Sequence, residues 1–204
     1  MVSDLVQTAL AQFDQVMFSE LSACPYCGGP VLGYDTREKK FAVLIENDRE
    51  RKIMVKVKRF SCKNCRSLCY ADEPFYPDTR LGSPVVDLCI TLAATMPRNR
   101  VAKALEIMGV LVDRSSCRNY NLAHFGNINT AEVFGMRIPF SILSLSSLAA
   151  RTSEGSRIKG AEALAACGFP SAHRAALQLP VPGKERDEGN EEKGKEERKM
   201  QKPE

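Results

Sequence analysis

Two cysteine pairs of identical spacing are the residues in this sequence best suited to chemistry. Residues 24–27 and 62–65 both follow the pattern Cys-x-x-Cys, which holds two thiols across a tight turn. Two such pairs complete the closed four-sulfur shell of a structural zinc site. Gly28, Gly29 and Asn64 are residue types that tolerate these turns. The spacing therefore predicts one structural zinc ion bound by Cys24, Cys27, Cys62 and Cys65.

Other uses of these thiols fit the sequence less well. A redox dithiol would need a single Cys-x-x-Cys that opens a helix within a βαβ pattern, and neither pair has that context. Cys69 is close enough to Cys65 to replace a ligand, although its apolar neighbours also suit a buried strand position. Four cysteines leave no open metal position for a catalytic water. With no nucleophile–base pair, phosphate loop or carboxylate cluster in the sequence, we expect no enzyme activity.

The composition favours the cell interior and a polyanionic partner. The chain begins with no charged and then apolar leader, and no apolar run approaches the roughly 20 residues that span a bilayer, so we expect a cytoplasmic protein without a membrane partner. Eight cysteines in a reducing compartment are typical of metal ligands or buried thiols. Residues 37–66 hold eleven Lys and Arg against four Asp and Glu, which suits nucleic acid. The alternative is an ordinary solvated hairpin.

The elements that must position the cysteines are a helix and a small zinc ribbon. Residues 1–21 predict an amphipathic helix with Ser3 as its N-cap. Residues 22–76 predict the ribbon, with strands at 41–45 and 53–60 joined by a loose polar turn at 46–52. Basic and apolar side chains alternate in the second strand, so one face packs and the other offers Lys56 and Lys58 to solvent or phosphate.

Residues 77–125 predict three helices in a helix-turn-helix-like arrangement. The helices cover residues 83–95 with Ser83 as cap, 97–108, and 114–124, and Gly109 ends the second. In a helix-turn-helix the last helix enters the major groove while the preceding helix crosses the backbone. The side chains expected at base edges or phosphates are Arg114, Ser115, Arg118 and Asn119, with Arg98, Arg100 and Lys103 near the backbone. A plain three-helix bundle with basic solvent faces is the alternative.

The signal weakens beyond these helices. Residues 126–183 are small, weakly periodic and broken by glycine and proline, so we expect a poorly defined segment without a second core. Residues 184–204 contain seven basic and eight acidic side chains and a single apolar one, which predicts a disordered tail. The expected fold class is therefore α+β, a small zinc β-ribbon followed by a three-helix bundle and a charged tail.

The order of these motifs resembles a family. The chain has, in order, a predicted zinc ribbon, Tyr76-Pro77, the run Asn-Arg-Val-Ala-Lys-Ala-Leu at 99–105, a Gly-x-x-Val turn at 109–112 and Arg-Ser-Ser at 114–116. This order makes the chain similar to the N-terminal DNA-binding region of prokaryotic insertion-sequence transposases of the DDE type. The resemblance covers roughly residues 20–125. It implies binding to double-stranded DNA.

The sequence departs from this family in the segment that should follow the DNA-binding region. In such transposases a ribonuclease-H-like domain with three acidic metal ligands follows the DNA-binding region. Here no Asp occurs between Arg114 and Arg186, and only Glu132, Glu154 and Glu162 precede the tail. We therefore expect a truncated or catalytically inactive relative. The alternative function is a zinc-ribbon interaction module within a transcription or other nucleic-acid machine, and a homo-oligomer or protein partner is compatible with either.

Overall fold

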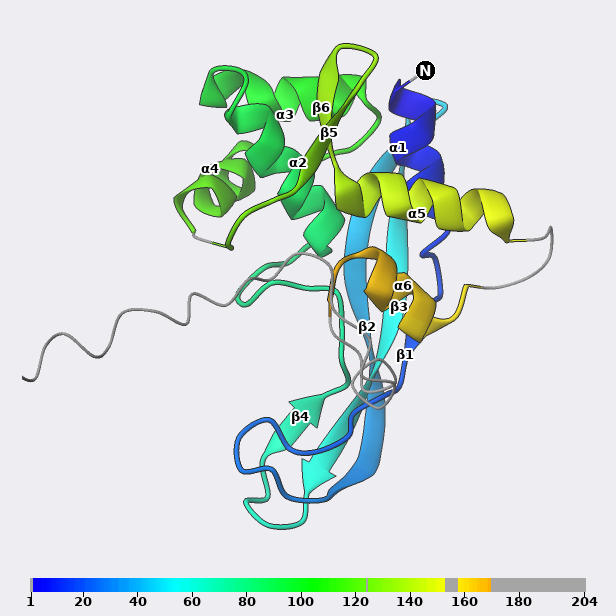
Figure 1. Ribbon diagram of the computed structural model, residues 1–204, viewed down its shortest axis with the longest axis vertical. Helices are drawn as coiled ribbons and strands as arrows, with labels where there is room; N and C mark the ends of the chain where they lie inside the picture. The colour runs from blue at the N-terminus through cyan, green and yellow to red at the C-terminus, as the bar shows by residue number, and fades with distance from the viewer. Residues whose placement is uncertain (1, 124, 153–157, 170–204) are drawn as a thin grey trace, which may run out of the picture.

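A long β-hairpin runs through the protein and connects the helical part to the cysteine loops. In the computed structural model, which describes residues 2–123, 125–152 and 158–169, helices gather around one half of the hairpin, and the cysteine loops and a short third strand lie at the other end (Figure 1). The predicted tail at 184–204 and the second part of the segment 126–183 lie outside the described residues. No described helix is long and apolar enough to cross a membrane.

The hairpin is longer and more tightly closed than the sequence predicted. Strands β2 (Val31–Glu46) and β3 (Arg49–Cys62) pair antiparallel almost throughout. Only Asn47 and Asp48 connect them, and both have positive φ, the backbone of a two-residue turn that matches strand twist. The predicted loose turn at 46–52 is therefore wrong, because these two residue types tolerate the left-handed conformation.

Two short strands complete the sheet beside β3. Strand β1 (Met17–Phe18) pairs parallel with β3, and β4 (Leu68–Tyr70) pairs antiparallel with it, nearer the cysteines. The N-terminal helix α1 (Val2–Ala11) is shorter than the predicted helix at 1–21, and Ser3 lies inside its first turn instead of capping it. Beyond the helix, Gln15 takes a positive φ and its N–H donates to the Met54 carbonyl, just before the chain enters β1.

The three predicted helices are present close to their expected bounds. They are α2 (Ser83–Ala93), α3 (Arg98–Ile107) and α4 (Arg114–Leu122), and each packs against the other two. Gly82 stands at the N-cap of α2 instead of Ser83, and Gly109 ends α3 with a φ of 76°, as predicted. The connection at 108–113 pairs with the edge of β2, whereas a helix-turn-helix has a turn of about 3–4 residues.

The segment after α4 also folds, contrary to the expectation for 126–183. Strands β5 (Thr130–Val133) and β6 (Met136–Pro139) form a second hairpin, followed by α5 (Phe140–Arg151) and α6 (Gly160–Ala166). Ile138, Ile142 and Leu145 are fully buried. The prediction failed because α5 is held by tertiary packing against α1 and α2, which short-range periodicity does not reveal.

One hydrophobic core unites the helices with the adjacent half of the hairpin. Phe13 stacks on Phe41 with ring centroids 4.3 Å apart, and the Gly82 N–H donates to the Phe41 carbonyl. The core also takes in residues from α2 through α6. Residues 22–76 and 77–125 are therefore not separate packing units. Cys24, Cys62 and Cys69 form a second, smaller cluster at the far end of the hairpin.

Candidate metal centre

The two Cys-x-x-Cys segments fold into loops with the same backbone hydrogen bonds. The N–H of Gly28 donates to the Cys24 carbonyl, and the N–H of Arg66 donates to the Cys62 carbonyl. Both donors take a positive φ, 68° for Gly28 and 61° for Arg66. The second loop therefore turns at Arg66, whereas the sequence had suggested Asn64. This repeated geometry points both cysteines of each loop toward the other loop.

The loops also hold each other in place. The Lys63 N–H donates to the Pro30 carbonyl over 2.9 Å. A Cβ on Gly29 would lie 2.6 Å from the Asn64 side-chain nitrogen, so the Asn64 side chain packs against the space that glycine leaves open. The strand pair Val31 and Cys62 continues this contact into the hairpin. The sheet and the loop contacts together fix the distance between the two cysteine pairs.

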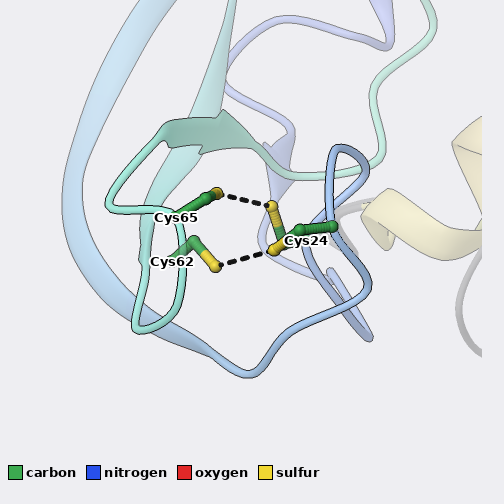
Figure 2. A group of neighbouring side chains, drawn as sticks. Cys24, Cys62 and Cys65 are labelled. Atoms are coloured by element: carbon green, nitrogen blue, oxygen red, sulfur yellow. Dashed lines mark hydrogen bonds between the residues drawn. The ribbon is translucent and has the colours of Figure 1, made fainter.

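The four predicted ligands form one cluster with the spacing of a tetrahedral metal site. The sulfurs of Cys24, Cys27, Cys62 and Cys65 all lie within 4.8 Å of one another. The Cys24–Cys65 and Cys27–Cys62 sulfur distances are 3.6 Å and 3.5 Å, and Figure 2 shows the labelled thiols turned toward a common centre. Four sulfurs about 2.3 Å from a tetrahedral zinc ion lie about 3.8 Å apart. The donor set therefore fits a four-sulfur metal site.

The surroundings of the cluster favour thiolate formation at Cys65. Hydrogen bonds from the hydroxyl and the backbone N–H of Ser67 lower the pKa of the Cys65 thiol to about 6. A metal ion binds the thiolate and not the thiol. Cys24 and Cys62 are buried while Cys27 and Cys65 are exposed, so the cluster is open on one side.

No protein-family model, curated protein or solved structure matches this chain. The resemblance to transposase DNA-binding regions therefore remains a hypothesis drawn from the sequence.

The two faces of β3 have different surroundings. On one face, Ile53, Val55 and Val57 are buried in the main core. On the opposite face, Lys56 and Lys58 are half-buried at the surface, as the alternation predicted. Phe60, which belongs to the main core, and Cys62 in the cysteine cluster follow on that face. The metal loops and the two lysines therefore lie on the same face of the hairpin.

Two further lysines on this face were missed by the sequence reasoning. The register pairs Lys40 with Met54 and Val43 with Lys52, which puts both lysines beside Lys56 and Lys58. None of the four forms an ion pair with an acidic side chain among the described residues. We call Lys40, Lys52, Lys56 and Lys58 the lysine face. Lys52 follows the alternation of β3 itself, whereas Lys40 reaches this face because the pairing shifts by one residue between Lys40 and Ala42.

The helical residues predicted to contact DNA lie on α3 and α4, beside the other half of the hairpin (Figure 1). The basic ones, Arg98, Arg100, Lys103, Arg114 and Arg118, are exposed, as are Ser115 and Asn119. Lys103 is paired with Glu106 over 3.2 Å. The structure groups the residues of α3 and α4 near one another but leaves them apart from the metal loops.

An acidic residue at the start of α4 was not anticipated. Asp113 is the N-cap and accepts hydrogen bonds from the Ser116 N–H at 2.8 Å and from the Ser115 hydroxyl at 2.5 Å. The Ser115 and Ser116 hydroxyls lower the pKa of Asp113 to about 2. The Ser115 hydroxyl is therefore already engaged, and a negative charge stands at the end of the helix that was expected to face DNA. An Asp before a helical run is a recognisable cap signal in sequence.

Proposed function

We propose that the chain is a DNA-binding protein in which a zinc ion holds the end of the β-hairpin and the lysine face contacts the phosphate backbone. The observation that carries the proposal is the lysine face itself. Four ammonium groups that form no ion pair among the described residues occupy one side of the hairpin, next to a four-thiol cluster. They outnumber the two carboxylates that the register places on the same side, Glu38 opposite Lys56 and Glu50 beside Lys52. Unpaired cations of this kind attract a polyanion, and release of its counterions drives binding.

Zinc is the ion that this donor set favours. Thiolate ligands in a tetrahedral arrangement select zinc or an iron–sulfur cluster, and paired Cys-x-x-Cys loops on a ribbon are typical of structural zinc. Four sulfurs fill the shell, so the metal supplies stability and no chemistry. The motif order in residues 20–125 supports the interpretation that the chain is a non-enzymatic relative of transposase DNA-binding regions.

Helix α4 would add contacts to the edges of DNA bases. Arg114, Arg118 and Asn119 are exposed on the first turns of α4, where side chains of a recognition helix reach base edges. The longer connection before α4 and the Asp113 carboxylate count against a standard helix-turn-helix docking. The proposal therefore assigns affinity mainly to the lysine face and leaves sequence preference to α4.

A salt titration with matched variants tests the proposal. Binding of the zinc-loaded chain to a fluorescent duplex of about 20 base pairs should weaken steeply with salt, and Lys56→Ala or Lys58→Ala should each reduce the log–log salt slope by about one unit. Arg51→Ala is the control, because Arg51 lies on the same strand but is paired with Glu46 and Asp14. An absence of duplex binding at low salt would refute DNA binding and favour the protein-interaction alternative.

A further inference from the structure

The ribbon face opposite the cysteine cluster exposes large side chains at the far end of the hairpin. Strand pairing aligns Leu32, Ser61 and Leu68 in one row, and Arg59 lies opposite Tyr70 in the next. Tyr34 lies beside Arg59 in an irregularity of β2. We call Leu32, Tyr34, Arg59, Leu68 and Tyr70 the outer ribbon face. The exposed fractions of the four large apolar and aromatic side chains are 54% for Leu32, 62% for Tyr34, 45% for Leu68 and 40% for Tyr70.

A cation lies against each of the two tyrosine rings. The Lys39 ammonium nitrogen is 4.0 Å from the centroid of the Tyr70 ring, and the Arg59 guanidinium carbon is 5.6 Å from the centroid of the Tyr34 ring. Both cations are held by carboxylates, Lys39 by Glu73 at 2.5 Å and Arg59 by Asp35 at 2.6 Å. A cation therefore lies against one part of each ring, and a large part of each ring remains exposed.

The charge around these rings is positive. Asp35 is shared between Arg59 and Arg37, whose guanidinium lies 3.5 Å from it and whose side chain is largely exposed. Because register places Arg37 opposite Val57, it projects from the same side of the hairpin as Arg59. One carboxylate therefore serves two guanidinium groups, and the surplus charge belongs to the more exposed of them.

We propose that the outer ribbon face binds single-stranded nucleic acid, with Tyr34 and Tyr70 each stacking on an unpaired base and Arg37 contacting a phosphate. Exposed aromatic rings on an open sheet, flanked by cations, are the arrangement that holds unpaired bases without sequence preference. A tyrosine side chain has few rotatable bonds, so its ring loses little conformational entropy when a base stacks on it.

Two other occupants fit this face less well. Bases within a duplex are stacked on one another and offer no face to a tyrosine ring. A protein partner would suit Leu32 and Leu68. The cations of this face, Arg37, Lys39 and Arg59, outnumber the carboxylates that pair with them, Asp35 and Glu73, which favours a polyanion. The inference goes beyond the proposed function, because it uses the opposite side of the hairpin from the lysine face and needs no contact from α4.

Tyrosine variants and a fluorescent oligothymidine of about 16 nucleotides test the stacking. In the zinc-loaded full chain, Tyr34→Ala and Tyr70→Ala should each weaken binding by roughly tenfold, whereas Tyr34→Phe and Tyr70→Phe should stay within about twofold because the ring remains. Phe134→Ala is the control, since Phe134 is 80% exposed but lies in the β5–β6 turn at the other end of the molecule (Figure 1). Zinc content and circular dichroism should match wild type in every variant.

An abasic oligonucleotide of the same length separates stacking from phosphate attraction. It should bind weakly, and equally to wild type and to both alanine variants. Because the chain has no tryptophan, its near-ultraviolet emission comes from tyrosine, and oligothymidine should quench that emission while the abasic strand should not. Equal affinity for both oligonucleotides, or alanine variants that bind like wild type, would overturn the inference.

Duplex binding measured on the same proteins keeps the two proposals apart. The tyrosine variants should bind duplex like wild type. Tyrosine-dependent oligothymidine binding without duplex binding would remove the proposed function and leave this inference standing. Duplex binding without oligothymidine binding would do the reverse. If no oligonucleotide binds and Tyr70→Ala instead changes the sedimentation of the chain, the face is a protein interface and the inference is wrong.

Discussion

The sulfur of Cys69 lies 3.7 Å from the sulfur of Cys24, on the buried side of the metal cluster. It is nevertheless outside the set of four sulfurs that are mutually within 4.8 Å. Cys69 sits on β4 opposite Phe60, so the sheet fixes it behind Cys24, whereas Cys65 reaches the centre from a loop. This arrangement assigns Cys69 to the packing around the site and Cys65 to the metal.

Substitution of these two cysteines tests the assignment. Cys69→Ser should retain about one zinc per chain, with a loss of stability of about 1–3 kcal/mol for placing a hydroxyl at a buried position. Cys65→Ser should lower zinc affinity by orders of magnitude. Elemental analysis after competition with a chelator measures both. Full zinc retention in Cys65→Ser, with loss in the double variant, would instead show that Cys69 replaces Cys65 as a ligand.

Removal of the metal should open only one end of the hairpin. The small cluster around Cys62 has few apolar contacts of its own, while Phe41 and its neighbours belong to the main core. Zinc binding to such a site is worth roughly 10–16 kcal/mol in apparent free energy, more than so small a cluster supplies by packing. Hydrogen exchange after chelation should therefore speed up in the cysteine loops and β4, but not in α2.

The control for this experiment is Cys62→Ser, which should give the same exchange pattern without chelator. Helical circular dichroism should persist in both samples. A single cooperative loss of all structure on chelation would contradict the prediction and would mean that the hairpin transmits the loss of metal into the main core.

A buried carboxyl predicts how stability varies with pH. Asp87 on α2 accepts hydrogen bonds from the Tyr76 and Ser141 hydroxyls, each over 2.7 Å, yet burial raises its pKa to about 6. Between about pH 4 and 6 the folded chain therefore holds a proton that the unfolded chain has released. The free energy of unfolding should fall across this window as pH rises, by about 3 kcal/mol in total, and level off above it.

The variant Asp87→Asn isolates this effect from that of the thiol ligands, which also take up protons as pH falls. It should remove the fall between about pH 4 and 6, because the amide does not titrate and the two hydroxyls can rotate to suit it. Urea unfolding of both proteins at several pH values measures the difference between them. Identical pH profiles for the two proteins would show that Asp87 titrates normally.

The parts of the fold that the sequence could predict depend on short-range signals. Cysteine spacing identified all four members of the cluster, and the alternation around Lys56 separated a packed face from an exposed one. The periodicity of residues 83–122 located three helices to within a few residues. Each of these signals is contained within a few consecutive residues or in a repeated spacing.

The remaining features depend on contacts between distant segments. Register shifts within β2 decide two of these placements: the shift between Lys40 and Ala42 puts Lys40 on the lysine face, and a second shift nearer the cysteines puts Leu32 in the same row as Leu68. Helix α5 owes its place to α1, far earlier in the chain. Gly82 is needed because a Cβ there would lie 2.2 Å from the Phe41 ring, a contact that no local pattern reveals.

The final prediction tests whether α4 faces DNA. The Asp113 carboxylate caps the helix, with its pKa lowered to about 2, and is therefore charged at neutral pH. A negative charge there would repel a phosphate that approached the start of the helix, so Asp113→Asn, which preserves the cap, should raise duplex affinity several-fold. Arg118→Ala should weaken binding by about 1–3 kcal/mol if Arg118 reads a base, with relaxed preference at one position.

Asp113→Ala supplies the control, because it removes the charge and the cap together and should cost about 1 kcal/mol of stability. Comparison of the Asn and Ala variants by fluorescence anisotropy at fixed low salt separates electrostatic repulsion from fraying of the helix. If α4 docks as proposed, the Asn variant binds duplex more tightly than wild type, and the gain shrinks as salt screens the charge. Unchanged affinity in Asp113→Asn and Arg118→Ala alike, with Lys56→Ala still weakened, would confine DNA contact to the lysine face.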